Sequence, residues 1–393
     1  MLGDVISGPD LVQTPITHNL IRGALDLEQT AYGLLPHRLP AWARERADGQ
    51  LAFAQAQPSG VRLAFRTRAS VVVLETVPTK QVYVGAPARP DGVYDLVVDG
   101  ELVGQATAKG GTILTIDMDT GAMDVAQGEP VAVEFADLGT HEKDVEVWLP
   151  WNERTELVSL RTDAPVEPLP DRGRPVWLHH GSSISQGSNA DSPTTTWPAV
   201  AASQAGVDLV NLGFGGSALL DPFVARVIRD TPADLISLKL GVNLVNMDLM
   251  RLRALAPAVH GFLDTIRDGH PETPLLVVSP ILCPIHEETP GPCEMDLSDG
   301  RLRFRASGDP AEVPQGKLTL QVIRQELARV VQQRADDDPQ LTYLDGLELY
   351  GEHDEAAHPL PDDLHPDAAT HRVIGERFAR HWLADPSRVR VGE

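Results

Sequence analysis

The chain has 393 residues, a length at which two domains are more common than one core. Its 42% hydrophobic and 23% charged residues are ordinary for a soluble globular protein, and no apolar run is long enough to span a membrane. The formal net charge of −23 argues against nucleic acid and against an anionic membrane surface, because both would repel the chain.

The first residues and the two cysteines bear on the compartment. The sequence MLGDV lacks the basic and then apolar segments of a secretory signal, so we expect a cytoplasmic protein unless a leader was removed. Cys283 and Cys293 lie in one Pro- and Gly-rich loop, where free thiols are expected and a disulfide stays open. A zinc site formed by them with His286 would have unusual spacing, so we expect no metal and no organic cofactor.

The first half of the chain has the pattern of β-strands. Residues 39–44 resemble a turn entering a short amphipathic segment, and from Leu51 to about Thr162 short strand-like runs alternate with turns. Asp99-Gly100 between two such runs is a strong hairpin signal. The expected strands cover residues 61–66, 71–74, 94–98, 102–103, 112–116, 131–135, 145–148 and 157–160. Many short strands without a long helix favour an all-β sandwich of jelly-roll kind.

A Pro-rich connection over residues 164–175 marks the expected domain boundary, which gives domains 1–168 and 172–393. After it, five expected strands alternate with helical segments, which predicts a mainly parallel, doubly wound α/β sheet. The expected strands are 176–180, 208–212, 234–240, 275–280 and 341–345, and the helices lie near 195–205, 221–230, 249–269, 317–335 and 366–382.

Candidate catalytic groups follow the first three of these strands. Gly181-Ser182-Ser183 comes after the first, and a serine there needs a base, an orienting group and an oxyanion hole from elsewhere in the chain. The glycine-rich turn 213–217 follows the second strand and offers backbone N–H groups to an oxyanion. Asn243 follows the third strand with a side-chain amide donor.

A candidate base lies just before the last expected helix. Asp362 precedes His365 by three residues, so on one turn its carboxylate can accept from the imidazole Nδ1–H. Nε2 is then free to take a serine proton. The alternatives are that Asp362 and Asp363 only favour the N-terminus of the helix, and that His365 is a polar residue before Pro366.

These four blocks, in this order over residues 175–385, resemble the SGNH hydrolases, also called the GDSL esterase/lipase family. The resemblance implies a flavodoxin-like parallel sheet, the SGNH hydrolase fold. It implies Ser183 as nucleophile, His365 as general base and Asp362 as its orienting group, with an oxyanion hole from the N–H groups of Ser183 and Gly216 and the Asn243 amide. Block alignment selects Ser183 over Ser182 and Ser185, and Gly216 over Gly215.

Two residues depart from the family pattern. Ser182 and Leu244 stand where the family usually has Asp. Neither usual Asp is the nucleophile or the orienting carboxylate, so activity is expected to survive with altered loop packing. The all-β first half also resembles that of two-domain SGNH carbohydrate esterases, and residues 92–96, GVYDL, are similar to a motif in the N-terminal domain of some bacterial members.

The expected function is a serine esterase that hydrolyses a small-acyl, preferably acetyl, ester of a small molecule such as a carbohydrate. The alternatives are an acyltransferase that uses the same serine, a lipase or lysophospholipase acting on longer chains, a carbohydrate-binding protein with a decayed site, and an assembly subunit. An oligomer stays open. Residues 279–316 are expected to form a lid or a solvated insertion, and Trp148 and Trp151 to pack between domains or to stack on sugar. His179 and His180, at the end of the first strand, are expected to be structural or to line the pocket.

Overall fold

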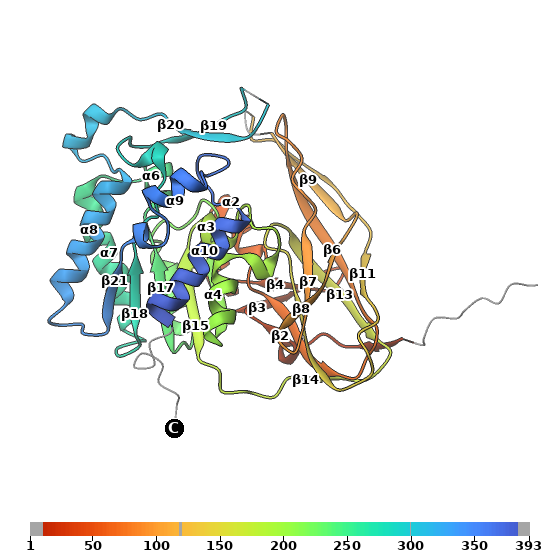
Figure 1. Ribbon diagram of the computed structural model, residues 1–393. Helices are drawn as coiled ribbons and strands as arrows, with labels where there is room; N and C mark the ends of the chain where they lie inside the picture. The colour runs from red at the N-terminus through yellow and green to blue at the C-terminus, as the bar shows by residue number, and fades with distance from the viewer. Residues whose placement is uncertain (1–10, 118–119, 299, 384–393) are drawn as a thin grey trace, which may run out of the picture.

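The computed structural model describes residues 11–117, 120–298 and 300–383, which form two regions side by side (Figure 1). The N-terminal region consists mainly of β-sheet, and the C-terminal region is a parallel sheet covered by helices. The first five residues, on which the expected compartment depends, lie outside the described residues. Among the described helices, none combines the length and apolar character of a membrane span.

Two sheets pack against each other in the N-terminal region, as the alternating pattern predicts. The larger sheet contains β1 (Val12–Thr14), β3 (Asp26–Gln29), β4 (Leu34–His37), β6 (Val72–Tyr83), β9 (Thr112–Ile116), β10 (Met123–Ala126), β11 (Val131–Phe135) and β13 (Arg154–Thr162). The smaller sheet contains β2 (Ile21–Arg22), β5 (Arg62–Thr67), β7 (Val93–Val98), β8 (Glu101–Thr107), β12 (Lys143–Trp148) and β14 (Val166–Pro168). Alternate side chains such as Leu63, Phe65, Val145 and Val147 are fully buried between the sheets.

The predicted hairpin at Asp99-Gly100 joins β7 to β8, with Val98 opposite Glu101. Both turn residues have positive φ, 50° for Asp99 and 92° for Gly100, the conformation that this two-residue turn requires. The expectation that strands begin at Leu51 is wrong. Residues 49–56 form helix α2 (Gly49–Ala56), preceded by α1 (Ala41–Arg44).

Helix α2 forms because its N-terminus is capped and its residues favour a helix. The Asp48 carboxylate accepts from the backbone N–H of Leu51, and Gln, Leu and Ala dominate the helix. Leu51 and Ala54 are buried in the core of the α/β region and not in that of the sandwich. The N-terminal region therefore supplies part of the second core.

The predicted parallel sheet is confirmed, with strand order β16-β15-β17-β18-β21. Numbered along the chain this is 2-1-3-4-5, the flavodoxin-like order. The strands are β15 (Val176–Gly181), β16 (Asp208–Gly213), β17 (Leu235–Lys239), β18 (Leu275–Val278) and β21 (Leu341–Leu344). The chain continues from β15 to β16 on one side of it and then to β17 on the other side. At such a switch point the connections leave in opposite directions, so ligands are expected at the carboxyl end of β15.

Helices cover both faces of this sheet. They are α3 (Ser183–Gln186), α4 (Trp197–Ala205), α5 (Pro222–Asp230), α6 (Val242–Asn246), α7 (Leu252–Arg267), α8 (Leu320–Arg334), α9 (Glu352–Ala357) and α10 (Ala368–Phe378). On one face, Trp177 of β15 stacks on Phe378 of α10, and on the other His180 stacks on Phe262 of α7. Short 3-10 helices cover His18–Leu20, Pro193–Thr195, Pro284–His286, Pro310–Gln315 and Gly346–Glu348, and a π-helical turn covers Ala379–Leu383.

The two regions are joined by hydrogen bonds as well as by the shared core. Asp95 of β7, fully buried, accepts through Oδ2 from Ser192 Oγ at 2.6 Å and from the backbone and hydroxyl of Thr194.

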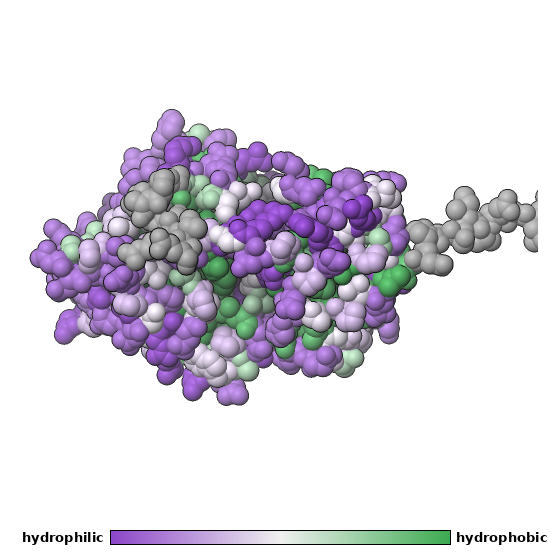
Figure 2. Space-filling model, turned by 90° about the horizontal axis from the view of Figure 1, so that it is seen from below, coloured by the Kyte–Doolittle hydropathy of each residue, from purple (hydrophilic) through white to green (hydrophobic). Residues whose placement is uncertain are grey.

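Seen from below, the surface is mostly hydrophilic, with apolar side chains gathered mainly in the middle of this face (Figure 2).

Candidate active site

The candidate nucleophile, Ser183, is the first residue of α3 and follows the carboxyl end of β15. Ser182 caps the helix by accepting from the Ile184 N–H at 3.3 Å, so a serine performs the capping at the position where the family usually has Asp. Gly181 leaves room for this turn, because an added Cβ would lie 2.3 Å from Oγ of Ser185. Ser183 itself is only half-buried and can meet a substrate.

Ser183, His365 and Asp362 lie in one hydrogen-bonded row. Ser183 Oγ is 2.9 Å from Nε2 of His365, and Nδ1 of His365 is 2.8 Å from Oδ2 of Asp362. The first pair is 182 residues apart in sequence, and the fold brings it together at the carboxyl edge of the sheet. With Nδ1–H donating to the carboxylate, Nε2 is the acceptor for the serine proton, which is the arrangement that a serine nucleophile needs.

Asp362 is held by four donors. Oδ1 accepts from the backbone N–H groups of Leu364 and His365 at 3.0 and 2.7 Å, and Oδ2 accepts from Asn189 Nδ2 at 3.1 Å as well as from His365. Burial raises the pKa of this carboxyl, but the hydrogen bonds and charge of His365 and the backbone donors outweigh burial and leave the pKa below its usual value. Asp363 points elsewhere and pairs with Arg303 at 2.9 Å.

The three candidate oxyanion donors, Ser183, Gly216 and Asn243, follow the carboxyl ends of β15, β16 and β17. Asn243 is buried in α6, and its Oδ1 accepts from the Ala218 N–H at 3.1 Å, which leaves Nδ2 on the opposite side of the amide. Within the part of the chain that the structure describes, Nδ2 of Asn243 and the backbone N–H groups of Ser183 and Gly216 have no protein acceptor.

The Gly215 N–H, in contrast, is already used, because it donates to Oε1 of Gln186 at 2.7 Å. A Cβ added to Gly215 would lie 3.7 Å from Cβ of Ser183, so the glycine turn packs directly beside the serine. The geometry therefore leaves Gly216 and not Gly215 as the free donor of this turn.

Residues 180–373 match the model of the GDSL-like lipase/acylhydrolase family. This part of the chain is a GDSL domain. The chain is accordingly an enzyme of the carboxylic ester hydrolase class. Among curated protein sequences, none matches the chain.

Several solved structures are similar to this chain over most of its length. A salicylyl-acyltransferase, SsfX3, from a tetracycline biosynthetic pathway is 28% identical with a TM-score of 0.79, covering 97% of this chain and 99% of that one. A GDSL-like lipase from Bacteroides ovatus is 17% identical, with a TM-score of 0.66 over 94% and 96% of the two chains. A family two carbohydrate esterase from Clostridium thermocellum, solved with cellohexaose, is 12% identical, with a TM-score of 0.53 over 81% and 90%.

The segment after β18 of the GDSL domain reaches over the Asp362–His365 loop. It contains a hairpin of β19 (Cys293–Asp296) and β20 (Arg303–Ala306), seen above the sheet in Figure 1. Phe304 of β20 donates its N–H to the Asp362 carbonyl at 3.0 Å, and its ring meets the His365 ring edge-on at 5.4 Å. The hairpin thus packs directly against the candidate base.

The cysteines beside this hairpin are free thiols. Cys283 is buried with Sγ 3.4 Å from the Asp363 carbonyl, and burial raises the pKa of Cys293 to about 11, so both stay protonated at neutral pH. In the described residues, no three His, Cys, Asp or Glu side chains come together to hold a metal ion.

The two histidines of β15 are structural. His179 is fully buried between Ser237 and Ser185 hydroxyls, each 2.8 Å away, and burial lowers its pKa well below the usual value. Burial likewise lowers the pKa of His180 to about 4, and its Nδ1–H donates to the Leu212 carbonyl. Both rings are therefore neutral at pH 7.

The candidate sugar-stacking tryptophans serve packing. Arg62 covers the ring of Trp148 at 4.8 Å, and Trp151 donates from Nε1 to the Ala190 carbonyl of the GDSL domain at 3.2 Å.

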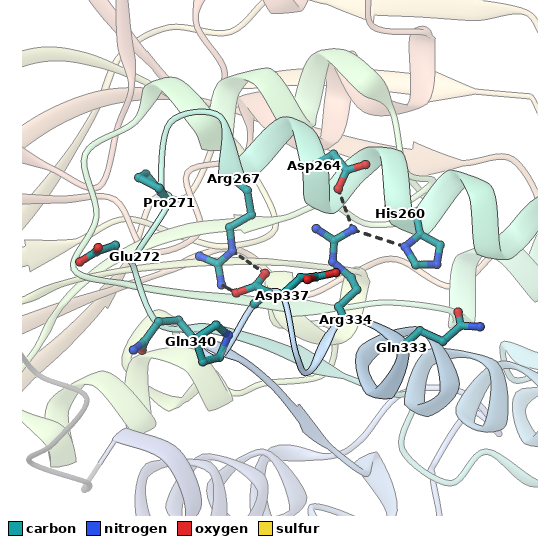
Figure 3. A pocket seen from close by; sticks show the side chains of 11 residues that line it. His260, Asp264, Arg267, Pro271, Glu272, Gln333, Arg334, Asp337 and Gln340 are labelled. Carbon is teal, nitrogen blue, oxygen red and sulfur yellow. Dashed lines mark hydrogen bonds and ion pairs between the residues drawn. The ribbon is translucent and has the colours of Figure 1, made fainter.

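A pocket between α7 and α8 lies at the opposite edge of the sheet from Ser183 (Figure 3). Its arginines form ion pairs, Arg267 with Asp338 and Arg334 with Asp264. These ion pairs connect neighbouring elements, so we interpret the pocket as structural.

The site also contains residues that the sequence analysis missed. Asn189 bonds Asp362, and Gln186 lies on the nucleophile helix and bonds Gly215. Phe304 supports His365. Position within the first block was a signal for Gln186, but no local pattern marks the other two, because they meet the site only through tertiary structure.

Proposed function

We propose that the protein is a serine esterase that forms an acyl-enzyme at Ser183 and releases a small acyl group, preferably acetyl, to water. The observation that carries the proposal is the row from Ser183 Oγ through His365 to Asp362, with distances of 2.9 and 2.8 Å. His365 Nε2 takes the hydroxyl proton as Oγ attacks the ester carbonyl, and Asp362 stabilises the imidazolium that forms.

The collapse of the tetrahedral intermediate expels the alcohol, which takes its proton from His365. The N–H groups of Ser183 and Gly216 and the amide of Asn243 carry the oxyanion meanwhile. Water then attacks the acyl-enzyme with His365 as base, and the acid leaves. These steps need no metal or organic cofactor.

The choice of a carbohydrate ester rests on the fold shared with the two-domain carbohydrate esterases. A second candidate, transfer of the acyl group to the hydroxyl of an acceptor molecule, is favoured by the similarity to the salicylyl-acyltransferase along nearly the whole chain. The two reactions share the acyl-enzyme and differ only in the nucleophile that resolves it.

Product analysis separates these functions. The protein is incubated with p-nitrophenyl acetate, longer-chain p-nitrophenyl esters and acetylated sugars, with and without a phenolic or sugar alcohol as acceptor, and Ser183→Ala is the control. Free acetate as main product in the presence of acceptor supports the esterase, and an ester of the acceptor supports transfer. Preference for long chains would favour a lipase. The absence of Ser183-dependent turnover on every ester would contradict the proposal.

A further inference from the structure

Helix α2, from the N-terminal region, lies against the glycine turn of the GDSL domain. A Cβ added to Gly216 would lie 3.2 Å from Nε2 of Gln50, the second residue of α2. That amide nitrogen donates to the Gly215 carbonyl at 2.9 Å. The hydrogen bond joins residues 165 positions apart, so a side chain of the N-terminal region contacts the proposed oxyanion turn of the GDSL domain.

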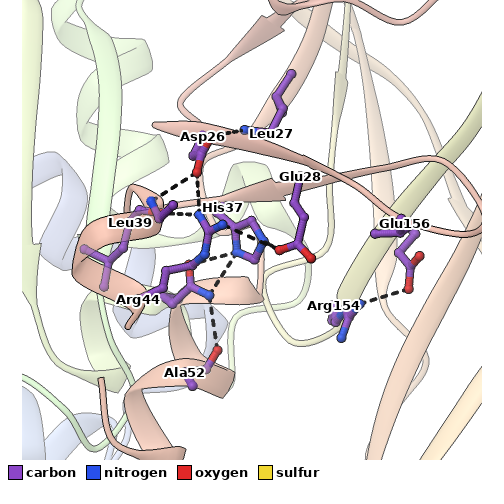
Figure 4. Close-up of polar contacts among 12 residues, drawn as sticks. Asp26, Leu27, Glu28, His37, Leu39, Arg44, Ala52, Arg154 and Glu156 are labelled. Carbon is purple, nitrogen blue, oxygen red and sulfur yellow. Dashed lines mark hydrogen bonds and ion pairs between the residues drawn. The ribbon is translucent and has the colours of Figure 1, made fainter. Parts of the chain in front are cut away.

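Helix α2 is fixed firmly enough to act as a support. Gln55 of α2 bonds Nδ1 of His37 at 2.9 Å, and Nε2 of His37 bonds Glu28 at 2.9 Å (Figure 4). Nearby, Arg44 pairs with Asp26 at 2.7 Å. The side of α2 that faces the GDSL domain is buried through Leu51 and Ala54.

Arg38 ties α2 to the strand that leads into the glycine turn. Its guanidinium is fully buried and donates to the Asn211 carbonyl at 3.1 Å, to the Gly213 carbonyl and to the Ala54 carbonyl of α2. Burial lowers its pKa to about 9, so Arg38 is still a cation at pH 7. Helix and strand end are therefore held to each other by one side chain.

Both polar groups of Gly215 are held by glutamine side chains. Its N–H donates to Gln186 of α3 at 2.7 Å, and its carbonyl accepts from Gln50 of α2 at 2.9 Å. The Gly215 carbonyl and the Gly216 N–H belong to one planar trans peptide, so they point in opposite directions. Holding the carbonyl toward α2 therefore directs the Gly216 N–H away from α2.

This peptide needs an external hold because it joins two glycines. Without Cβ atoms, both residues reach positive φ at little cost, and Gly216 has a φ of 72°. A rotated peptide would point its carbonyl, an acceptor, where the N–H donor is needed. Oxyanion donors act through being preorganised, so this rotation would weaken transition-state binding more than substrate binding.

We propose that Gln50 is a positioning residue that fixes the Gly215–Gly216 peptide and thereby aims the Gly216 N–H at the oxyanion. This inference rests on the proposed function, in which Gly216 is an oxyanion donor. It assigns to the N-terminal region a part in positioning the oxyanion hole of the GDSL domain.

The test compares Gln50→Ala and Gln50→Glu with the full-length protein on p-nitrophenyl acetate between pH 5 and 8. Gln50→Ala should lower kcat about 10-fold and leave KM within about twofold, less than the roughly 100- to 1,000-fold loss of a whole donor because the N–H is still present. Thermal melts check that the variants fold. Gln332→Ala and Gln332→Glu, at an exposed position of α8, are the matched controls.

Gln50→Glu adds a pH-dependent measurement that distinguishes positioning through the hydrogen bond from a general effect on structure. An ionised carboxylate cannot donate to the Gly215 carbonyl, whereas the protonated acid, with an ordinary pKa of about 4.3, can. The ratio of its kcat to that of the wild type should therefore rise as the pH falls, and the ratio for Gln50→Ala should stay flat.

A folded Gln50→Ala with the wild-type kcat, an effect confined to KM, or a flat ratio for Gln50→Glu would overturn the role of Gln50. In each of these cases the wild type still turns over through Ser183, so the proposed function survives. A wild type without Ser183-dependent turnover removes the proposed function and, with it, this role.

Discussion

At the residue scale, the site depends on a few side chains whose hydrogen-bonding capacity is divided between structure and chemistry. Asn243 accepts the Ala218 N–H through Oδ1, and its Nδ2 is the proposed oxyanion donor. Asp362 accepts two backbone N–H groups through Oδ1, and through Oδ2 it accepts from His365 and Asn189. Each residue thus orients its functional atom through its other atom.

Asn243→Ala should lower kcat about 100- to 1,000-fold, because it removes one oxyanion donor. The variant also leaves the Ala218 N–H without its partner, which costs about 1–3 kcal/mol and leaves a typical protein folded. Steady-state kinetics and a urea melt measure the two effects. Asn246→Ala, on the same helix α6, should retain activity, and an Asn243→Ala enzyme as active as wild type would exclude the amide from the oxyanion hole.

The neighbouring carboxylates Asp362 and Asp363 are expected to differ sharply. Asp362→Asn should lower kcat by up to roughly 10⁴-fold, because an amide in place of the carboxylate favours the wrong tautomer of His365. Asp363→Asn only removes the exposed ion pair with Arg303, and it should keep activity within a few-fold. Equal losses in the two variants would contradict the assignment of Asp362.

At the scale of elements, the hairpin β19–β20 packs against His365, the candidate base, through Phe304. Phe304→Ala removes the edge-on contact with the His365 ring, a kind of contact that contributes about 0.5–1.5 kcal/mol. We expect kcat/KM to fall about 2- to 10-fold. Leu297→Ala, at an exposed position of the same hairpin, is the control and should leave kcat/KM unchanged. If Phe304→Ala has the kcat/KM of the wild type, the hairpin does not contribute to the reaction.

The elements of the parallel sheet could be predicted because buried strands and helices carry strong local patterns. β15 begins with the apolar run Val176-Trp177-Leu178 and ends at Gly181, and α8 carries apolar residues at helical spacing, such as Ile323 and Leu327, on its buried side. The candidate triad was implied by the resemblance of the four blocks, in their order, to the GDSL family, and the fold brings its three side chains within hydrogen-bond distance.

Helix α2 could not be predicted as part of the site. Its sequence is short, and its buried residues Leu51 and Ala54 pack on a core most of whose other members come more than a hundred residues later. The contact of Gln50 with Gly215 likewise has no local signature, because only the docking of the two regions creates it.

At the scale of the whole molecule, the two regions are connected by packing and by hydrogen bonds. They share a core through Leu51 and Ala54, the Asp95 carboxylate joins β7 to the Ser192–Thr194 turn, and Arg38 joins α2 to β16.

Buried histidines are expected to make the stability of the protein depend on pH. Burial lowers the pKa of His180 and of His371 to about 4.

The protein should lose stability as the pH falls from about 6.5 to 4. In that window the unfolded chain binds protons on these histidines, with an ordinary pKa of about 6.5, and the folded chain does not. The stabilisation is therefore full above pH 6.5, and each group contributes up to about 3 kcal/mol that is lost by pH 4. Urea unfolding at several pH values measures it.

His371→Gln should reduce this pH dependence, because one linked proton is removed. His353→Gln, at an exposed position of α9, should leave it unchanged. A free energy of unfolding that stays constant from pH 6.5 to 4.5 would contradict the neutral, buried state of these rings.

The proposed acyl-enzyme at Ser183 can be detected directly by mass spectrometry. The protein is mixed with p-nitrophenyl acetate, quenched in acid within the first turnovers and digested. We expect one acetyl group on the peptide that contains Ser183, located on Ser183 by fragmentation, and none in Ser183→Ala or after a long incubation. Turnover without any acetylated serine, or with the acetyl group on Ser182 or Ser185, would contradict it.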